Sequence, residues 1–268
     1  MRLLAAALAG VVAVALAGVL AGAGPALAEG PLPPGAVADY QLGGGYPPPP
    51  GVTVVVRDST DRPAPGLYSI CYVNGFQTQP GADWPKDLLL QGPDGAPLAD
   101  PGWPDEFLLD IATPEARAAN MDLLRPTLQA CAARGFDAVE FDNLDSFTRS
   151  GGRLTEADAL AFAALLVAEA EKLGLPAGQK NTAELGRRGH EVAGFAFAVT
   201  ESCHRWAECA AFTGVYGADQ VLGIEYADDL RGTFAEACAD PDRPGSLILR
   251  DRMLAPAGAA EHVFASCP

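Results

Sequence analysis

Short apolar runs recur along the chain, and several of them end in polar or aromatic residues. They occupy residues 37–42, 52–58, 67–74, 106–111, 138–143, 175–181, 194–202 and 220–226. Runs of this length that are rich in β-branched and aromatic residues are typical of strands. The pattern therefore predicts eight strands.

Between the later runs lie sequences with clear helix signals. Thr113 and Pro114 predict a helix start, because threonine caps helices and proline suits the first turn; this helix should extend to Arg134. Thr155 and Asp158 resemble a capping box that begins a second helix. Alternating strands and helices indicate a parallel sheet, and eight strands predict a single α/β domain, a (β/α)8 TIM barrel. An open sheet is the alternative, because helix signals are weaker in the first half.

Residues 1–28 have the pattern of a secretory signal peptide. A basic residue at position 2 precedes a long apolar run that ends in Ala26-x-Ala28. The run is nearly long enough to span a membrane, so an uncleaved anchor is the alternative. Gly24-Pro25 favours removal. We therefore expect residues 29–268 to form one barrel domain that is secreted to the extracellular space as a monomer, without membrane attachment after cleavage.

Cysteine content and charge fit an exported protein. Six cysteines predict disulfides, and among the fifteen possible pairings sequence proximity favours Cys203–Cys209 and Cys238–Cys267. Metal binding by cysteines is not expected, because the chain has no CxxC or CxxH spacing. The net charge of −16 has two interpretations: it serves solubility alone, or it also repels nucleic acid and other anionic polymers and attracts cationic ones. Charge by itself does not decide between them.

Negative charge is concentrated in GFDAVEFDNLD, residues 135–145, where an apolar run ends. In an α/β barrel, functional residues gather at the carboxyl ends of the strands. Side chains alternate between the two faces of a strand. We therefore expect Glu140 and Asp142 to point into the barrel, with Asp142 at the rim, while Val139 and Phe141 pack beneath the helices.

A second acid, Glu201, ends the run at 194–202, two strands further on. The strand spacing places the carboxylates of Asp142 and Glu201 roughly 5–9 Å apart, as a pair for glycoside hydrolysis requires. Lys180 ends the intervening run and is expected to pair with Glu140 or Glu225, forming a supporting charge network, because an unpaired buried charge is costly. A turn role for Asp142 and a helix start at Glu201 are the alternatives.

With these residues considered together, the chain resembles glycoside hydrolase family 114, the endo-α-1,4-polygalactosaminidase-like proteins. The resemblance covers about residues 40–226 and rests on an ordered set of motifs: YQLGG (40–44), ICYVNGFQ (70–77), LLDI (108–111), GFDAVEFDNLD (135–145), LTEADAL (154–160), GQKN (178–181), TESC…EC (200–209) and GIEY (223–226). It implies a barrel that cuts galactosamine polymers internally, with Asp142 and Glu201 as the catalytic pair. Two departures stand out: Ala38-Asp39 where the family often has tryptophan, and Phe141 where it commonly has proline.

The expected site includes further residues near strand ends. We expect substrate contacts from Tyr40, Tyr72, Asp110, Asn143, Lys180, Glu225 and Tyr226, and support from Glu140. No cofactor or metal is expected, and the partner is a polysaccharide, cationic if deacetylated. Glu201 is assigned as the acid and Asp142 as nucleophile or base, with the stereochemical outcome left open. A non-catalytic carbohydrate-binding barrel at the cell surface is one alternative; a metal-dependent hydrolase is disfavoured, because the three histidines form no HxH or HExxH pattern.

Overall fold

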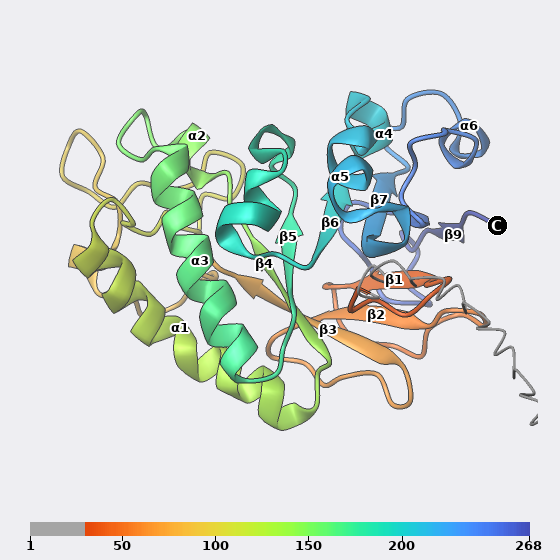
Figure 1. The fold of residues 1–268 in the computed structure, drawn as a ribbon, viewed down its shortest axis with the longest axis horizontal. Coiled ribbons are helices and arrows are strands. Elements are labelled where there is room, and N and C mark those ends of the chain that lie inside the picture. Colours follow the sequence, from red (N-terminus) through yellow and green to blue (C-terminus); the bar gives the residue numbers. More distant parts are fainter. Residues whose placement is uncertain (1–29) are drawn as a thin grey trace, which may run out of the picture.

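The computed structural model describes residues 30–268 (Figure 1), so the expected signal peptide lies outside the described residues. Nine strands of this part of the chain form one sheet in chain order. They are β1 (Ala38–Gln41), β2 (Val54–Asp58), β3 (Tyr68–Asn74), β4 (Ala138–Asp142), β5 (Ala177–Lys180), β6 (Phe197–Glu201), β7 (Val221–Tyr226), β8 (Ser246–Arg250) and β9 (Phe264–Ser266). Neighbours from β1 to β8 are parallel, and β9 runs antiparallel to β8.

Side chains close the sheet into a barrel between β1 and β8, which share no backbone ladder. Ser246 Oγ accepts a hydrogen bond from Ala38 N at 2.8 Å. The fully buried guanidinium of Arg250 donates to Asp39 Oδ1 at 2.9 Å and also to the carbonyl of Tyr40. The predicted α/β barrel of parallel strands is therefore confirmed.

One of the eight predicted strands was wrong. Residues 106–111 contain no barrel strand; they make only isolated antiparallel bridges within the long β3–α1 connection. The eighth parallel strand is β8, which was not predicted. As a result, the runs at 138–143, 194–202 and 220–226 are the fourth, sixth and seventh strands.

Helices cover only part of the barrel. They are α1 (Pro114–Arg134), α2 (Ser146–Arg149), α3 (Glu156–Lys172), α4 (Cys203–Trp206), α5 (Cys209–Tyr216) and α6 (Phe234–Cys238). In Figure 1, α1 and α3 lie side by side on one flank. The predicted caps are confirmed: Thr113 accepts a hydrogen bond from Ala116 N, and Thr155 and Asp158 form a capping box. The β1–β2 and β2–β3 connections, residues 42–53 and 59–67, contain no helix.

Shorter helical turns complete the connections. They are the 3-10 turns Lys86–Leu88, Ala183–Leu185 and Ala218–Gln220 and the π-helical turn Gly189–Ala193. Within residues 30–268, none of the helices combines the length and apolar character that a membrane span requires.

Apolar residues pack on both faces of the sheet. The barrel interior is filled by alternate strand residues: Ala38, Tyr40, Val54, Val56, Ile70, Ala138, Phe197, Val199, Leu222, Ile224, Tyr226 and Ile248. Val139 and Phe141 instead pack in the core beneath α1 and α3, as predicted. Gly178 leaves room for the interior ring of Phe197, since a Cβ at this position would lie 2.4 Å from the ring.

Three disulfides link the described chain. Cys203–Cys209 and Cys238–Cys267 are the two pairings predicted from sequence proximity, and both are confirmed. The third, Cys71–Cys131, joins β3 to α1 over a separation of 60 residues. This bond encloses the whole β3–α1 connection in one covalent loop.

Candidate active site

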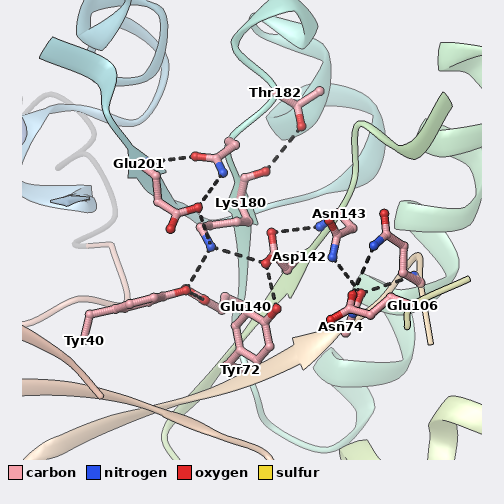
Figure 2. A network of polar contacts seen from close by, with 12 residues as sticks. Tyr40, Tyr72, Asn74, Glu106, Glu140, Asp142, Asn143, Lys180, Thr182 and Glu201 are labelled. Atoms are coloured by element: carbon pink, nitrogen blue, oxygen red, sulfur yellow. Dashed lines mark hydrogen bonds and ion pairs between the residues drawn. The ribbon is translucent and has the colours of Figure 1, made fainter. Parts of the chain in front are cut away.

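The carboxyl ends of the strands surround a cavity of about 590 Å³. Strand ends contribute Asp58, Tyr72, Asp142, Lys180, Glu201 and Tyr226 to its lining. Figure 2 shows the polar network at its centre, where Lys180 points between Asp142 and Glu201. The position agrees with the rule that α/β barrels bind their ligands at this face.

Asp142 ends β4 with both carboxylate oxygens occupied. Tyr72 donates its hydroxyl to Oδ2 at 2.7 Å, and the backbone N–H of Asn143 donates to Oδ1 at 2.8 Å. Tyr72 lies on the neighbouring strand and is paired in register with Glu140. These donors fix the direction in which the carboxylate faces the cavity.

Glu201 ends β6 and is held from both sides. Its N–H donates to Asn181 Oδ1 at 2.7 Å, and Asn181 Nδ2 donates back to Glu201 Oε2 at 3.0 Å. The hydroxyl of Tyr226 donates to the other oxygen, Oε1. Burial favours the neutral acid, but Lys180, Tyr226 and Asn181 together hold the pKa of Glu201 below its usual value.

The ammonium of Lys180 connects the two acids. Nζ lies 3.1 Å from Glu201 Oε2 and 3.5 Å from Asp142 Oδ2, so these two oxygens are separated by no more than the sum, about 6.6 Å. The side chain is 1% exposed. Burial alone would lower the pKa of Lys180, but Asp142, Glu201 and Glu140 outweigh burial and raise it. The ammonium therefore stays charged.

A third carboxylate lies beneath this pair. Glu140 is fully buried and accepts a hydrogen bond from Tyr40 Oη at 2.5 Å, while Lys180 Nζ donates to the same hydroxyl at 2.9 Å. Among the described residues its second oxygen, Oε2, has no partner. Burial, opposed by Lys180 and Tyr40, raises the pKa of Glu140 to about 7. Its charge can therefore change near neutral pH.

The backbone bends sharply directly after three charged residues of the site, Asp142, Lys180 and Glu201. Asn143, Asn181 and Ser202 follow Asp142, Lys180 and Glu201, and their φ angles are 64°, 49° and 60°. This left-handed conformation is uncommon for residues other than glycine, and it is best tolerated by asparagine and aspartate. Strands β4, β5 and β6 thus stop where their last side chains reach the cavity.

Most of the predicted site residues meet at the cavity. Asp142, Asn143, Lys180, Glu201, Tyr72 and Tyr226 line it, while Tyr40 and Glu140 lie beneath it. Residues not singled out from the sequence also contribute, among them Asn181, Glu106 and Arg149. For Asn181 a signal was present: it directly follows a charged residue at the end of a strand, as Asn143 does.

Two predicted residues lie outside the site. Asp110 accepts a hydrogen bond from Ala112 N just before α1 and does not line the cavity. Glu225 faces outward from β7 and accepts hydrogen bonds from the first backbone N–H groups of α4, so it does not contact Lys180. The expected pairing of Lys180 with Glu140 or Glu225 was therefore wrong; Lys180 pairs with Asp142 and Glu201.

Comparison with known proteins agrees with this fold. Residues 22–268 match glycoside-hydrolase family GH114, and the chain therefore belongs to this family of glycoside hydrolases. The structure of Aspergillus fumigatus Ega3 in complex with galactosamine is similar, with a TM-score of 0.68 and 20% identity over 84% of this chain and 94% of that chain. The glycoside hydrolase domain of Pseudomonas aeruginosa PelA gives a TM-score of 0.57 and 16% identity over 84% and 98%. At these identities both show a shared fold. Among curated proteins, none matches the chain.

Proposed function

We propose that this protein is an exported glycoside hydrolase that cleaves internal α-1,4 linkages of a galactosamine-containing polysaccharide, with Asp142 and Glu201 as the catalytic pair. The observation that supports the pair is that both carboxylates line one cavity and share the ammonium of Lys180. Glycoside hydrolysis needs two acidic groups on either side of one linkage. The proposed export of residues 29–268 agrees with the three disulfides.

The two acids would divide the reaction as follows. Glu201 protonates the leaving oxygen, and Asp142 attacks the anomeric carbon or activates a water molecule there. Tyr72 and the N–H of Asn143 hold Asp142 in one orientation. Lys180, Tyr226 and Asn181 hold the pKa of Glu201 below its usual value, so Glu201 must take up a proton before it can protonate the leaving oxygen.

Two observations support galactosamine as the sugar. The similar structure of Ega3 was determined with galactosamine, and the net charge of −16 attracts a polymer that carries free amines. Arg149 is one of only three basic residues that line the cavity, and its guanidinium is paired with Asp100 and Asp145. The cavity thus favours a cationic ligand.

The test measures release of oligosaccharides from an α-1,4-galactosamine polymer by the wild type, Asp142→Asn and Glu201→Gln. Asp122→Asn and Glu171→Gln are matched controls outside the cavity lining. Loss of either acid should lower kcat by a factor of about 10²–10⁴, and the controls should match the wild type. Full activity in both active-site variants would refute the assignment. Tight binding without product release would instead favour a carbohydrate-binding barrel, the alternative reading.

A further inference from the structure

A tight turn at one side of the cavity presents an aromatic ring and a carboxylate together. Trp103 and Glu106 both line the cavity, and Glu106 N donates to Trp103 O at 2.9 Å. Both belong to the β3–α1 connection, and Figure 2 shows Glu106 on the side of Asp142. We propose that this turn forms a subsite for a sugar unit with a free, positively charged amine, next to the linkage that is cleaved. The inference rests on the proposed function and specifies the unit that the site selects.

The Glu106 carboxylate has one oxygen held and one available. Oε2 accepts hydrogen bonds from Asn74 Nδ2 at 2.8 Å and from Gln77 Nε2 at 3.1 Å. Its acidic neighbours Asp100 and Asp145 each lie 2.6 Å from Arg149, whereas within residues 30–268 Glu106 forms no ion pair. The negative charge of Glu106 is therefore free to attract a cation from solution.

Arg149 dictates how the amides around Glu106 are turned, because a guanidinium can only donate. It donates to Gln77 Oε1 at 2.8 Å and to Asn143 Oδ1 at 3.1 Å, so both amide nitrogens face the other way. Asn143 Nδ2 then donates to Asn74 Oδ1 at 2.9 Å, which turns the nitrogen of Asn74 toward Glu106. Both series of hydrogen bonds therefore end with an amide N–H that donates to Glu106 Oε2, and Glu106 Oε1 remains available as an acceptor.

The same amides tie Glu106 to the catalytic centre. Asn143 also donates its backbone N–H to Asp142, so one asparagine connects the carboxylate of Asp142 with the Asn74–Glu106 pair. Burial, opposed by Gln77 and Asn74 and reinforced by Asp142, raises the pKa of Glu106. An ammonium bound at Oε1 would lower the pKa of Glu106 again. An acetamido group carries no charge and would not.

Trp103 supplies a surface for the sugar ring. Its side chain is 58% exposed, although large aromatic side chains are usually well buried. Hydrogen bonds of the Trp103 backbone to Asp100 and Glu106 hold the turn, so the ring itself is not needed to form it. Aromatic faces near a cavity mouth suit stacking against the apolar face of a pyranose. Stacking does not depend on the amine, which binds to the Glu106 carboxylate instead.

The test compares binding of two ligands by calorimetry: an α-1,4-galactosamine oligomer and its fully N-acetylated counterpart. Glu106→Gln should weaken binding of the amine form about tenfold, as expected for the loss of one charge-assisted hydrogen bond, and change the acetylated form less than about twofold. Asp105→Asn is the matched control, because this exposed neighbour carries the same charge outside the cavity lining. Trp103→Ala should weaken both ligands alike, and Trp103→Phe should restore most of the loss.

The proposal is overturned if Glu106→Gln weakens both ligands equally, if Asp105→Asn matches Glu106→Gln, or if the wild type binds neither oligomer. Hydrolysis is measured in parallel on the same samples. A wild type that binds the amine form through Glu106 but cleaves nothing would refute the proposed function and leave the subsite standing. Cleavage of the amine form at the wild-type rate by Glu106→Gln would refute the subsite and leave the proposed function standing.

Discussion

Lys180 Nζ lies 3.1 Å from Glu201 Oε2, and within the described residues this ammonium is the only cation that contacts the proposed catalytic pair, Asp142 and Glu201. Buried charges are tolerated when they are paired and hydrogen-bonded, and removal of one partner leaves the others uncompensated. Lys180 is therefore a sensitive point for substitution, because its loss would leave two carboxylates at the cavity without their shared cation.

Lys180→Met should move the pH profile of hydrolysis. Because Lys180 helps to hold the pKa of Glu201 down, its loss raises that pKa, and the limb that reports ionisation of Glu201 shifts to higher pH. The free energy of unfolding should fall by about 3–5 kcal/mol, as for other broken buried ion pairs. Lys172→Met, on the exposed side of α3, is the control and should change neither. An unshifted profile in Lys180→Met would contradict the role assigned to the ammonium.

Glu140→Gln should change how stability depends on pH. The folded-state pKa of about 7 lies above 4.5, the pKa of the carboxyl in an unfolded chain, so the native state binds the proton more tightly than the unfolded chain. This contribution is fully present below pH 4.5 and is lost as pH rises to 7, by about 3 kcal/mol in all. The variant should lack this loss. Urea unfolding at several pH values, with exposed Glu261→Gln as the control, measures it; parallel curves for wild type and Glu140→Gln would contradict it.

The spacing of the proposed catalytic pair predicts retention of configuration. Retaining enzymes place their carboxyl groups about 5–5.5 Å apart and inverting enzymes about 6.5–9.5 Å. The upper bound of about 6.6 Å between Asp142 Oδ2 and Glu201 Oε2 reaches only the lowest edge of the inverting range. Proton NMR of the first product formed should show the anomer of the original linkage. The opposite anomer as first product would show that a water molecule fits between the acids.

The disulfides should separate stability from activity. Closing a loop of 60 residues limits the unfolded chain more than closing one of 6, so replacing Cys71 and Cys131 by alanine should cost about 4 kcal/mol against about 2 for Cys203 and Cys209. Cys203, however, lies two residues after Glu201. Loss of the shorter bond should therefore lower kcat more. Urea unfolding measures the cost in stability, and steady-state kinetics measure kcat. The opposite order in either measurement would contradict this prediction.

The centre of the site was more predictable than its surroundings. Strand alternation and the position of strand ends are local rules, and they were enough to predict that Asp142 and Glu201 lie at the same end of the barrel. The run at 106–111 has the composition of a barrel strand, but nothing local tells whether a short apolar run pairs in parallel or within its own loop. Strand β8 was missed because it ends in Arg250, a residue that suggests the surface until Asp39 is known to lie beside it.

The partners of Lys180 and the role of Glu106 could not be derived from the sequence. Glu225 is one residue before Tyr226, and a single position decides whether a strand residue faces the cavity or the helices. Glu106 reaches the cavity only because the long β3–α1 connection folds back over the strand ends, held by Arg149. Contacts of this kind depend on how the whole chain packs.

The join between β1 and β8 has a consequence for the behaviour of the enzyme on warming. Arg250 and Ser246 hold the two strands together where the other parallel neighbours share backbone hydrogen bonds. Tyr40 sits on β1 at this join and orients Lys180 through its hydroxyl. Local opening between β1 and β8 would displace the ammonium of Lys180 while the rest of the barrel stays folded. On heating, hydrolysis should therefore be lost several degrees below the temperature at which the protein unfolds.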